Sequence, residues 1–287
     1  MEELKKKAYG KINLGLDVLG KREDGYHIVK MIMQTVDVYD TLTFLKTEGS
    51  DITMTTNHEG LPVDENNLCI RAAKLLKDEF LFEGGVSIHL EKRIPIAAGM
   101  AGGSADAACV LKAVNELFEL GLKKKELMER GLTLGADIPY CIMGGTALSE
   151  GIGEKLTRVS PMPTVNVLIA KPPVDVSTGK VYSALDSLES YEHPDIDGLM
   201  EAIEAEDVPT IAEKMGNVLA DVTMPMVPEV KTLVDFMESH GAIRAMMTGS
   251  GPTVFGIFED ENQMEECRKG LEKLDICENL YGTRTIV

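Results

Sequence analysis

The residues with the clearest chemical potential form a glycine-rich segment, 95–105, which contains Gly99, Gly102 and Gly103 followed by Ser104. Glycine lacks a Cβ, so its amide can approach a phosphate oxygen closely and its φ can be positive without strain. A phosphate site would explain the segment, although an ordinary tight turn also uses glycine and serine. The spacing is neither G-x-x-x-x-G-K-[ST] nor G-x-G-x-x-G, which disfavours a Walker A loop and a dinucleotide-binding loop.

This glycine segment lies between an expected strand and an expected helix. Apolar and polar residues alternate over 86–90, which is the period of a half-buried strand. Apolar residues then recur at helical spacing over 107–118, with Ser104 as the expected N-cap and Gly121 as the stop. The first amides of a helix are unpaired and carry the positive end of its dipole, so this order favours an anion at the loop.

A second set of polar residues lies on one face of an expected N-terminal strand. Lys11, Asn13 and Asp17 alternate there with apolar residues, so they share a face. A solvated strand face is the usual explanation for a lone lysine. Gly10 and Gly15 favour a functional face somewhat, because glycines in strands often mark the close approach of a ligand or another backbone.

Composition narrows the possible partners. The chain has 287 residues, and its 29 basic against 47 acidic residues give a net charge of −18, which disfavours nucleic acid and anionic membrane surfaces. Its five cysteines are widely spaced without a C-x-x-C pair, so we expect reduced thiols. No apolar run approaches transmembrane length, and the N-terminus lacks the apolar core of a signal peptide. A cytoplasmic enzyme is expected, and its oligomeric state stays open.

Strands and helices are mixed without strict alternation, which predicts an α+β fold in two domains, 1–160 and 161–287. Two strands, 28–38 and 41–45, are expected to be separated at Tyr39 and Asp40. Asp137 is expected on a short irregular link, because Pro139 disfavours helix at Ile138, the residue between them. A purely structural role, in which Asp137 caps a turn, is about as good an explanation as a functional one.

The glycine segment resembles the phosphate-binding motif of the GHMP kinases, a superfamily of small-molecule kinases. Residues 95–108 match the pattern Pro-x-x-x-Gly-Leu-Gly-Gly-Ser-Ser-x-Ala-Ala, with departures at Met100, Ala101 and Ala105. Residues 8–16 and 249–255 are similar to the first and third motifs of the superfamily. Three further segments resemble those typical of a member that acts on a cytidine diphosphate-linked alcohol: 22–27, 67–73 and 134–140.

The resemblance implies roles for particular residues. Lys11 and Asp137 match the catalytic pair. Asn67 aligns with a nucleotide contact, and the substrate contacts are Asn13, Tyr26, His27 and Tyr182, the last as a second aromatic ring on cytosine. A Tyr-His pair packed at the start of a strand is the bland alternative for Tyr26 and His27. The implied ATP phosphate loop consists of Pro95, Ile96, Ala97, Ala98, Gly99, Met100, Ala101, Gly102, Gly103, Ser104 and Ala105.

The resemblance also implies a fold and a reaction. The expected fold is α+β, with an N-terminal domain like ribosomal protein S5 domain 2 and a ferredoxin-like C-terminal domain. The expected reaction uses ATP and Mg²⁺ to phosphorylate the 2-hydroxyl of cytidine diphosphate-linked methylerythritol in non-mevalonate isoprenoid synthesis, and the metal ligands are unknown. The alternatives are a homoserine- or mevalonate-type kinase and a nucleotide-binding sensor without catalysis.

Overall fold

The structure, a computed structural model, describes residues 3–286, which form two compact units. Unit 1 contains 3–10, Val38–Ile96 and Ala101–Met143, and unit 2 contains Lys11–Asp37, Ala97–Met100 and 144–286. Strands β1 (Glu3–Lys21) and β2 (His27–Thr47) each supply residues to both units. Unit 2 therefore holds the described part of the predicted C-terminal domain and also takes three segments from the predicted N-terminal domain.

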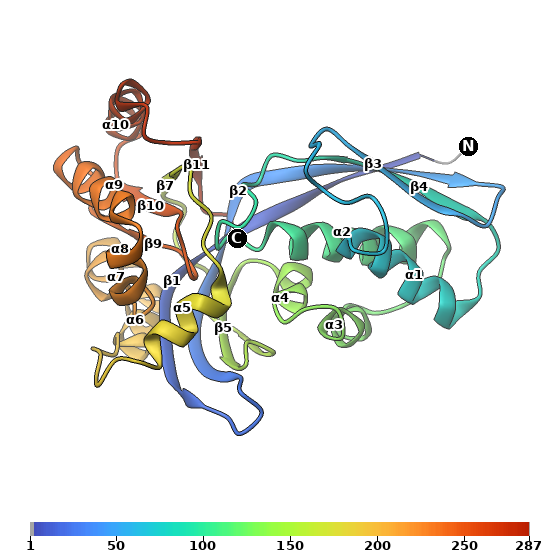
Figure 1. Ribbon diagram of the computed structural model, residues 1–287, viewed down its shortest axis with the longest axis horizontal. Coiled ribbons are helices and arrows are strands. Elements are labelled where there is room, and N and C mark those ends of the chain that lie inside the picture. The colour runs from blue at the N-terminus through green and yellow to red at the C-terminus, as the bar shows by residue number, and fades with distance from the viewer. Residues whose placement is uncertain (1–2, 287) are drawn as a thin grey trace. The chain divides into compact units, whose positions relative to one another are not determined.

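Unit 1 is built on β4 (Gly85–Glu91), whose apolar residues alternate as predicted. This strand pairs antiparallel with the C-terminal half of β2 and parallel with β3 (Ile52–Thr56). Helices cover one side of these strands (Figure 1). They are α1 (Leu68–Phe80), α2 (Gly102–Leu117), α3 (Lys124–Leu132) and α4 (Ile138–Met143).

Helix α2 is the central helix of unit 1 and packs against α1, α3 and α4. Its buried residues are mostly small, including Ala105, Ala107, Ala108 and Cys109. Small side chains let neighbouring helices approach closely, and burying this apolar face in a close-packed interior stabilises the unit. The glycine loop thus leads directly into a firmly packed helix.

Unit 2 contains two strand assemblies. In the first, β8 (Gly216–Asn217) pairs parallel with β1, while 29–34 of β2 pair antiparallel with β5 (Thr146–Gly151). Strand β5 also pairs with β6 (Lys155–Arg158). Residues 11–18 of β1 are all buried, so both faces of this part of the strand are covered.

The second assembly is an antiparallel sheet in the order β11-β7-β10-β9. Two helices, α9 and α10, pack on it. Apart from α5–α8 and β8, which are inserted between β7 and α9, the order of elements is β-α-β-β-α-β, so the ferredoxin-like prediction is confirmed. The bounds of these elements are β7 (Asn166–Lys171), β9 (Arg244–Met247), β10 (Val254–Phe258), β11 (Asn279–Arg284), α9 (Pro228–Ser239) and α10 (Glu261–Leu274). The remaining helices of this unit are α5 (Thr178–Leu185), α6 (Ile196–Glu204), α7 (Val208–Lys214) and α8 (Ala220–Met226).

Three local predictions are wrong. Strand β2 is continuous through Tyr39 and Asp40, because the buried Asp40 carboxylate accepts hydrogen bonds from the backbone amides of Arg93 and Ile94. Helix α2 begins at Gly102, so Ser104 lies inside its first turn and is not the N-cap.

The third concerns α4, which begins immediately after Asp137. Its second residue is Pro139, and proline is tolerated in the first turn of a helix because the amide there needs no helical partner. The aspartate itself lies in a turn, as expected.

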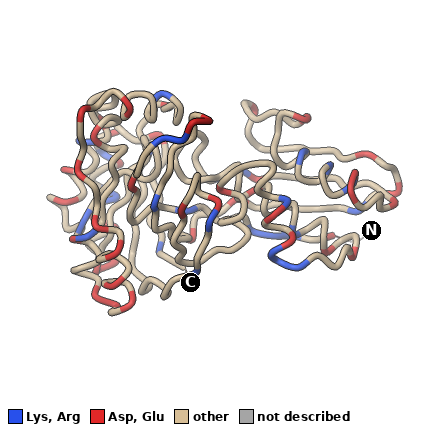
Figure 2. The backbone as a smooth tube through the Cα atoms, turned by 90° about the horizontal axis from the view of Figure 1, so that it is seen from below, with Lys and Arg blue, Asp and Glu red and all other residues tan. Residues whose placement is uncertain are grey.

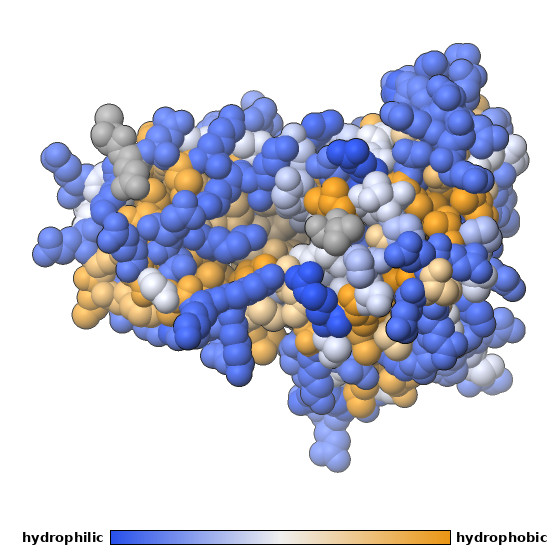
Figure 3. All heavy atoms as spheres, turned by 180° about the vertical axis from the view of Figure 1, so that it is seen from behind, coloured by the Kyte–Doolittle hydropathy of each residue, from blue (hydrophilic) through white to orange (hydrophobic). Residues whose placement is uncertain are grey.

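The distribution of charged residues along the backbone reflects the excess of acidic over basic residues in the sequence (Figure 2). Acidic positions are spread along much of the chain, with basic positions among them (Figure 2). Hydrophilic side chains cover much of the face seen in Figure 3, and apolar side chains show between them. The five cysteines are free thiols, as predicted. Within residues 3–286, no helix has both the length and the apolar character of a membrane span.

Candidate functional site

Lys11 lies in β1 with only 5% of its surface exposed. Its Nζ donates hydrogen bonds to Oδ1 of Asn13 and to the carbonyl oxygen of Gly99, both at 2.7 Å, and its backbone amide donates to the carbonyl of Met100. Lys11 and Asn13 are two residues apart and therefore share a strand face. This face is buried, so the solvated-face explanation is wrong, and the ammonium is fixed against the glycine loop.

Thr248, the residue before the third motif, contacts the first and second motifs. Its Oγ1 accepts a hydrogen bond of 3.0 Å from the amide of Asn13 and lies 3.5 Å from the carbonyl oxygen of Gly99. Gly99 has φ of +68°, and a Cβ there would lie 2.3 Å from the carbonyl oxygen of Thr248. Only glycine fits such a position, so Lys11, Asn13, Gly99 and Thr248 form one assembly within unit 2.

Asn217, which the sequence did not single out, holds the third motif in place. Its Nδ2 donates to the carbonyl oxygens of Met247 and Gly249, both at 2.9 Å, and its Oδ1 accepts from the amide of Leu219. The strand that carries it pairs with β1 beside Leu16. No motif or spacing identifies this asparagine, because its partners are 30 and 32 residues away.

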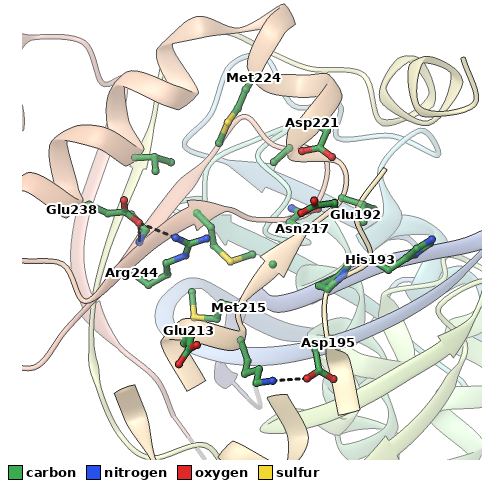
Figure 4. Close-up of a pocket in the computed structure, with 18 residues that line it drawn as sticks. Glu192, His193, Asp195, Glu213, Met215, Asn217, Asp221, Met224, Glu238 and Arg244 are labelled. Carbon is green, nitrogen blue, oxygen red and sulfur yellow. Dashed lines mark hydrogen bonds and ion pairs between the residues drawn. The ribbon is translucent and has the colours of Figure 1, made fainter. Parts of the chain in front are cut away.

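A cavity of about 550 Å³ in unit 2 has Asn217 in its wall (Figure 4). Five acidic residues line it against two basic ones, Lys214 and Arg244, which are already paired with Asp195 and Glu238. A triphosphate would be repelled by such a wall. The sequence predicted no site among these residues, and the charge excludes the cavity as the ATP phosphate site.

The glycine loop enters α2 through Ala101, which has a left-handed φ of +56°. No side chain caps this helix N-terminus, so its first amides are not used by a capping group. A Cβ on Gly103 would have only Leu68 Cδ1 nearby, at 3.8 Å. The predicted phosphate loop therefore has backbone amides at its helical end that no side chain among residues 3–286 caps.

Beneath the start of α2 lie Lys92, Asp40 and Asp106, here called the Lys92 cluster. Lys92 Nζ is 2.5 Å from Oδ2 of Asp40 and 2.7 Å from Oδ2 of Asp106, and all three side chains are at most 4% exposed. Burial raises the pKa of Asp106 to about 8 despite the attraction of Lys92, and Oδ1 of Asp106 has no hydrogen-bond partner among the described residues. A Cβ on Gly102 would lie 2.9 Å from Lys92 Nζ, so a larger residue there would crowd this cluster.

Two predicted site residues lie elsewhere in unit 1. Asn67 is the N-cap of α1: its Oδ1 accepts from the amide of Cys69, and its Nδ2 donates to the carbonyl of Pro62. Capping accounts for this asparagine fully, and its nucleotide contact stays a prediction. The catalytic role of Asp137 also stays a prediction.

Tyr26 and His27 follow a tight turn at the start of β2. The turn is closed by a hydrogen bond from the amide of Arg22 to the carbonyl of Tyr26, with Gly25 at φ of +87°. Tyr26 is 59% exposed, so its ring is available to a ligand. Because the following residue alternates to the other side of the strand, His27 is more buried, with 11% of its side chain exposed.

His27 is held by residues that the sequence did not link to it. Its Nε2 lies 2.7 Å from Oδ1 of Asp186, whose Oδ2 accepts from Lys21 Nζ at 2.6 Å; we call these three residues the Asp186 cluster. The hydrogen bonds from His27 and Lys21 lower the pKa of Asp186. Tyr182 packs its ring on that of His27, with centroids 4.6 Å apart, so this face of Tyr182 is occupied and its contact with cytosine stays a prediction.

The chain belongs to the GHMP kinases. The N-terminal domain of GHMP kinases matches residues 67–145, and the C-terminal domain matches residues 199–275. The first match contains the glycine loop and Asp137. The predicted family and the two-part α+β fold are therefore confirmed.

The similar proteins narrow the comparison further. A 4-diphosphocytidyl-2-C-methyl-D-erythritol kinase from Lachnospira eligens is 53% identical over 99% of both chains, and one from Clostridium beijerinckii is 46% identical over 99% of this chain and 100% of the relative. A crystal structure of 4-(cytidine 5'-diphospho)-2C-methyl-D-erythritol kinase superposes with a TM-score of 0.85 at 30% identity, covering 98% of this chain and 99% of the other. The homoserine kinase of Cytophaga hutchinsonii superposes at 0.79 with 18% identity, covering 100% of this chain and 95% of the other, which shows a shared fold alone.

Proposed function

We propose that the chain transfers the γ-phosphoryl group of ATP to the 2-hydroxyl of 4-diphosphocytidyl-2-C-methyl-D-erythritol. The supporting geometry is the assembly of Lys11, Asn13, Gly99 and Thr248, which fixes a buried ammonium against the glycine loop. Relatives that carry this activity in their names match nearly the whole chain. This reaction would be a step of non-mevalonate isoprenoid synthesis.

Each residue has a role in the proposed reaction. The uncapped amides at the start of α2 bind the ATP phosphates, and the ammonium of Lys11 stabilises charge on the transferring group. The 2-hydroxyl oxygen attacks the γ-phosphorus, the bond to the leaving ADP oxygen breaks, and Asp137 takes the hydroxyl proton. Asn13 and Tyr26 contact the alcohol substrate.

Mg²⁺ is part of this proposal. Among residues 3–286 there is no group of three or more His, Cys, Asp or Glu arranged to hold a metal ion. Mg²⁺ commonly keeps several waters and binds through substrate phosphates with one or two carboxylates. Mg²⁺ bound to ATP would neutralise charge on the phosphates. A cytoplasmic location and the absence of nucleic-acid partners also stay predictions.

Initial rates with ATP test the proposal. We expect phosphorylation of the cytidyl substrate and none of mevalonate or homoserine. Asp137→Asn keeps size and shape but cannot accept the proton, so kcat should fall by about 10²–10⁴ with little change in either KM. Asp235→Asn, a surface change in α9, is the control. Equal rates with mevalonate or homoserine would refute the substrate assignment, and a normal kcat in Asp137→Asn would remove its role as base.

A further inference from the structure

The Asp186 cluster constrains the imidazole of His27 at two points. Tyr182 covers one ring face, with the two ring planes 31° apart, and Asp186 binds Nε2. Among residues 3–286, Nδ1 of His27 has no hydrogen-bond partner. The one ring nitrogen left for a ligand is therefore Nδ1.

The partner at Nε2 decides which nitrogen carries the proton. A carboxylate can only accept hydrogen bonds, so an ionised Asp186 requires Nε2 to be the N–H donor. In the neutral ring, Nδ1 is then an acceptor. Lys21 Nζ pairs with the second oxygen of Asp186.

An acceptor at this position distinguishes the two common pyrimidines. Cytosine presents an amino group at C4, whereas uracil presents a carbonyl oxygen at the same place. The amino group can donate to Nδ1, but the carbonyl oxygen would face a second acceptor with no proton between them. A polar group left unpaired at a binding site reduces affinity.

We propose that Asp186 is a specificity-determining positioning residue, which holds His27 in the Nε2-protonated form so that Nδ1 accepts a hydrogen bond from the amino group of cytosine and rejects uracil. Lys21 keeps the charge of Asp186 compensated, and Tyr182 keeps the ring in its plane. The inference rests on the proposed function, because it explains how that site chooses its base.

Paired substrates test the choice of base. The wild type should use cytidine diphosphate-linked methylerythritol with kcat/KM about tenfold to hundredfold above that of its uridine diphosphate-linked analogue. Asp186→Asn can accept or donate, so this ratio should fall by about tenfold through a higher KM for the cytidyl substrate, with kcat and the ATP KM unchanged. Asp197→Asn is the matched control, since Asp197 also accepts a hydrogen bond from a lysine, Lys30, but has no histidine partner among residues 3–286.

Two further measurements keep the test decisive. Titration calorimetry with cytidine diphosphate and uridine diphosphate measures base selection without turnover. Nitrogen-15 NMR of wild-type His27 at the assay pH should show a protonated Nε2 and an unprotonated Nδ1, and this readout does not depend on the folding of any variant.

The outcomes separate the two proposals. Failure to phosphorylate the cytidyl substrate refutes the proposed function, whereas turnover with an unchanged base ratio in Asp186→Asn refutes the role of Asp186. A protonated Nδ1 in the wild type refutes that role as well. A lowered ratio together with the expected protonation supports it.

Discussion

The Lys92 cluster in unit 1 and the Asp186 cluster in unit 2 both join basic and acidic side chains, but the first has two acidic residues and the second has one. In the first, one ammonium is shared by two carboxylates, and all three side chains are buried. In the second, one carboxylate is shared by the side chains of Lys21 and His27 and is 31% exposed. Burial raises the pKa of Asp106 in the first cluster, whereas hydrogen bonds lower the pKa of Asp186 in the second.

The difference shows that solvent access decides what an ion pair does. In the Lys92 cluster, the cost of removing the Asp106 carboxylate from water exceeds the attraction of Lys92 for it. The free energy of unfolding therefore depends on whether Asp106 carries a proton. In the Asp186 cluster, water still solvates the charges, so pairing adds little stability and instead orients a side chain. The buried cluster should govern folding, and the exposed one should govern recognition.

The largest expected effect comes from Lys92→Met. This change keeps the side-chain length but leaves Asp40 and Asp106 buried without a cation, so the free energy of unfolding should fall by about 3–5 kcal/mol. Urea unfolding measures this. Lys231→Met removes a solvent-exposed pair with Asp235 and should leave the unfolding midpoint nearly unchanged. Similar midpoints for the two variants would contradict the comparison.

Asp106→Asn should change how stability depends on pH. The pKa of Asp106 is about 8 in the folded chain against an ordinary 3.8, so between these values the folded state holds a proton that the unfolded state releases. Its contribution to stability therefore falls as pH rises through this window and is constant above it. Asp106→Asn should remove that slope, gaining about 2 kcal/mol relative to the wild type between about pH 6 and 8. Parallel curves for the two proteins would show that Asp106 does not titrate there.

Tyr26→Ala tests recognition beside the Asp186 cluster. Loss of one base-stacking ring costs on the order of 1–3 kcal/mol of binding, so the KM for the cytidyl substrate should rise about tenfold. The ATP KM and the unfolding midpoint should not change, because this ring is 59% exposed. Steady-state kinetics and thermal unfolding measure these quantities. A raised ATP KM instead would place Tyr26 at the nucleotide.

A small effect on stability is expected for Asp186→Asn. Exposed ion pairs contribute at most about 1 kcal/mol. The lowered pKa of Asp186 means that its stabilising contribution is present above its ordinary pKa and is lost only as pH falls through the lower folded value. The variant and the wild type should therefore differ by a small constant amount between about pH 6 and 8. A change as large as that of Lys92→Met would show that this cluster is structural.

The sequence by itself determined many of the elements and the family. Local patterns are enough for this purpose, because alternation reports a strand face and glycine spacing reports a close backbone approach. The strand at 86–90 and the helix after the glycine loop were both predictable. The motifs also identified Lys11 and Asn13 as candidates.

Only the tertiary structure decided which of these residues meet and in what environment. Asn217 and Asp186 became recognisable through contacts with residues distant in sequence, which no local pattern encodes. The continuity of β2 depended on distant amides that satisfy Asp40. The burial of Lys11 was also decided by the tertiary structure, because alternating polar and apolar residues are equally compatible with a solvated strand face and a covered one. Solvent access is a property of the packed chain, and it fixes the charge and hydrogen bonding of each side chain.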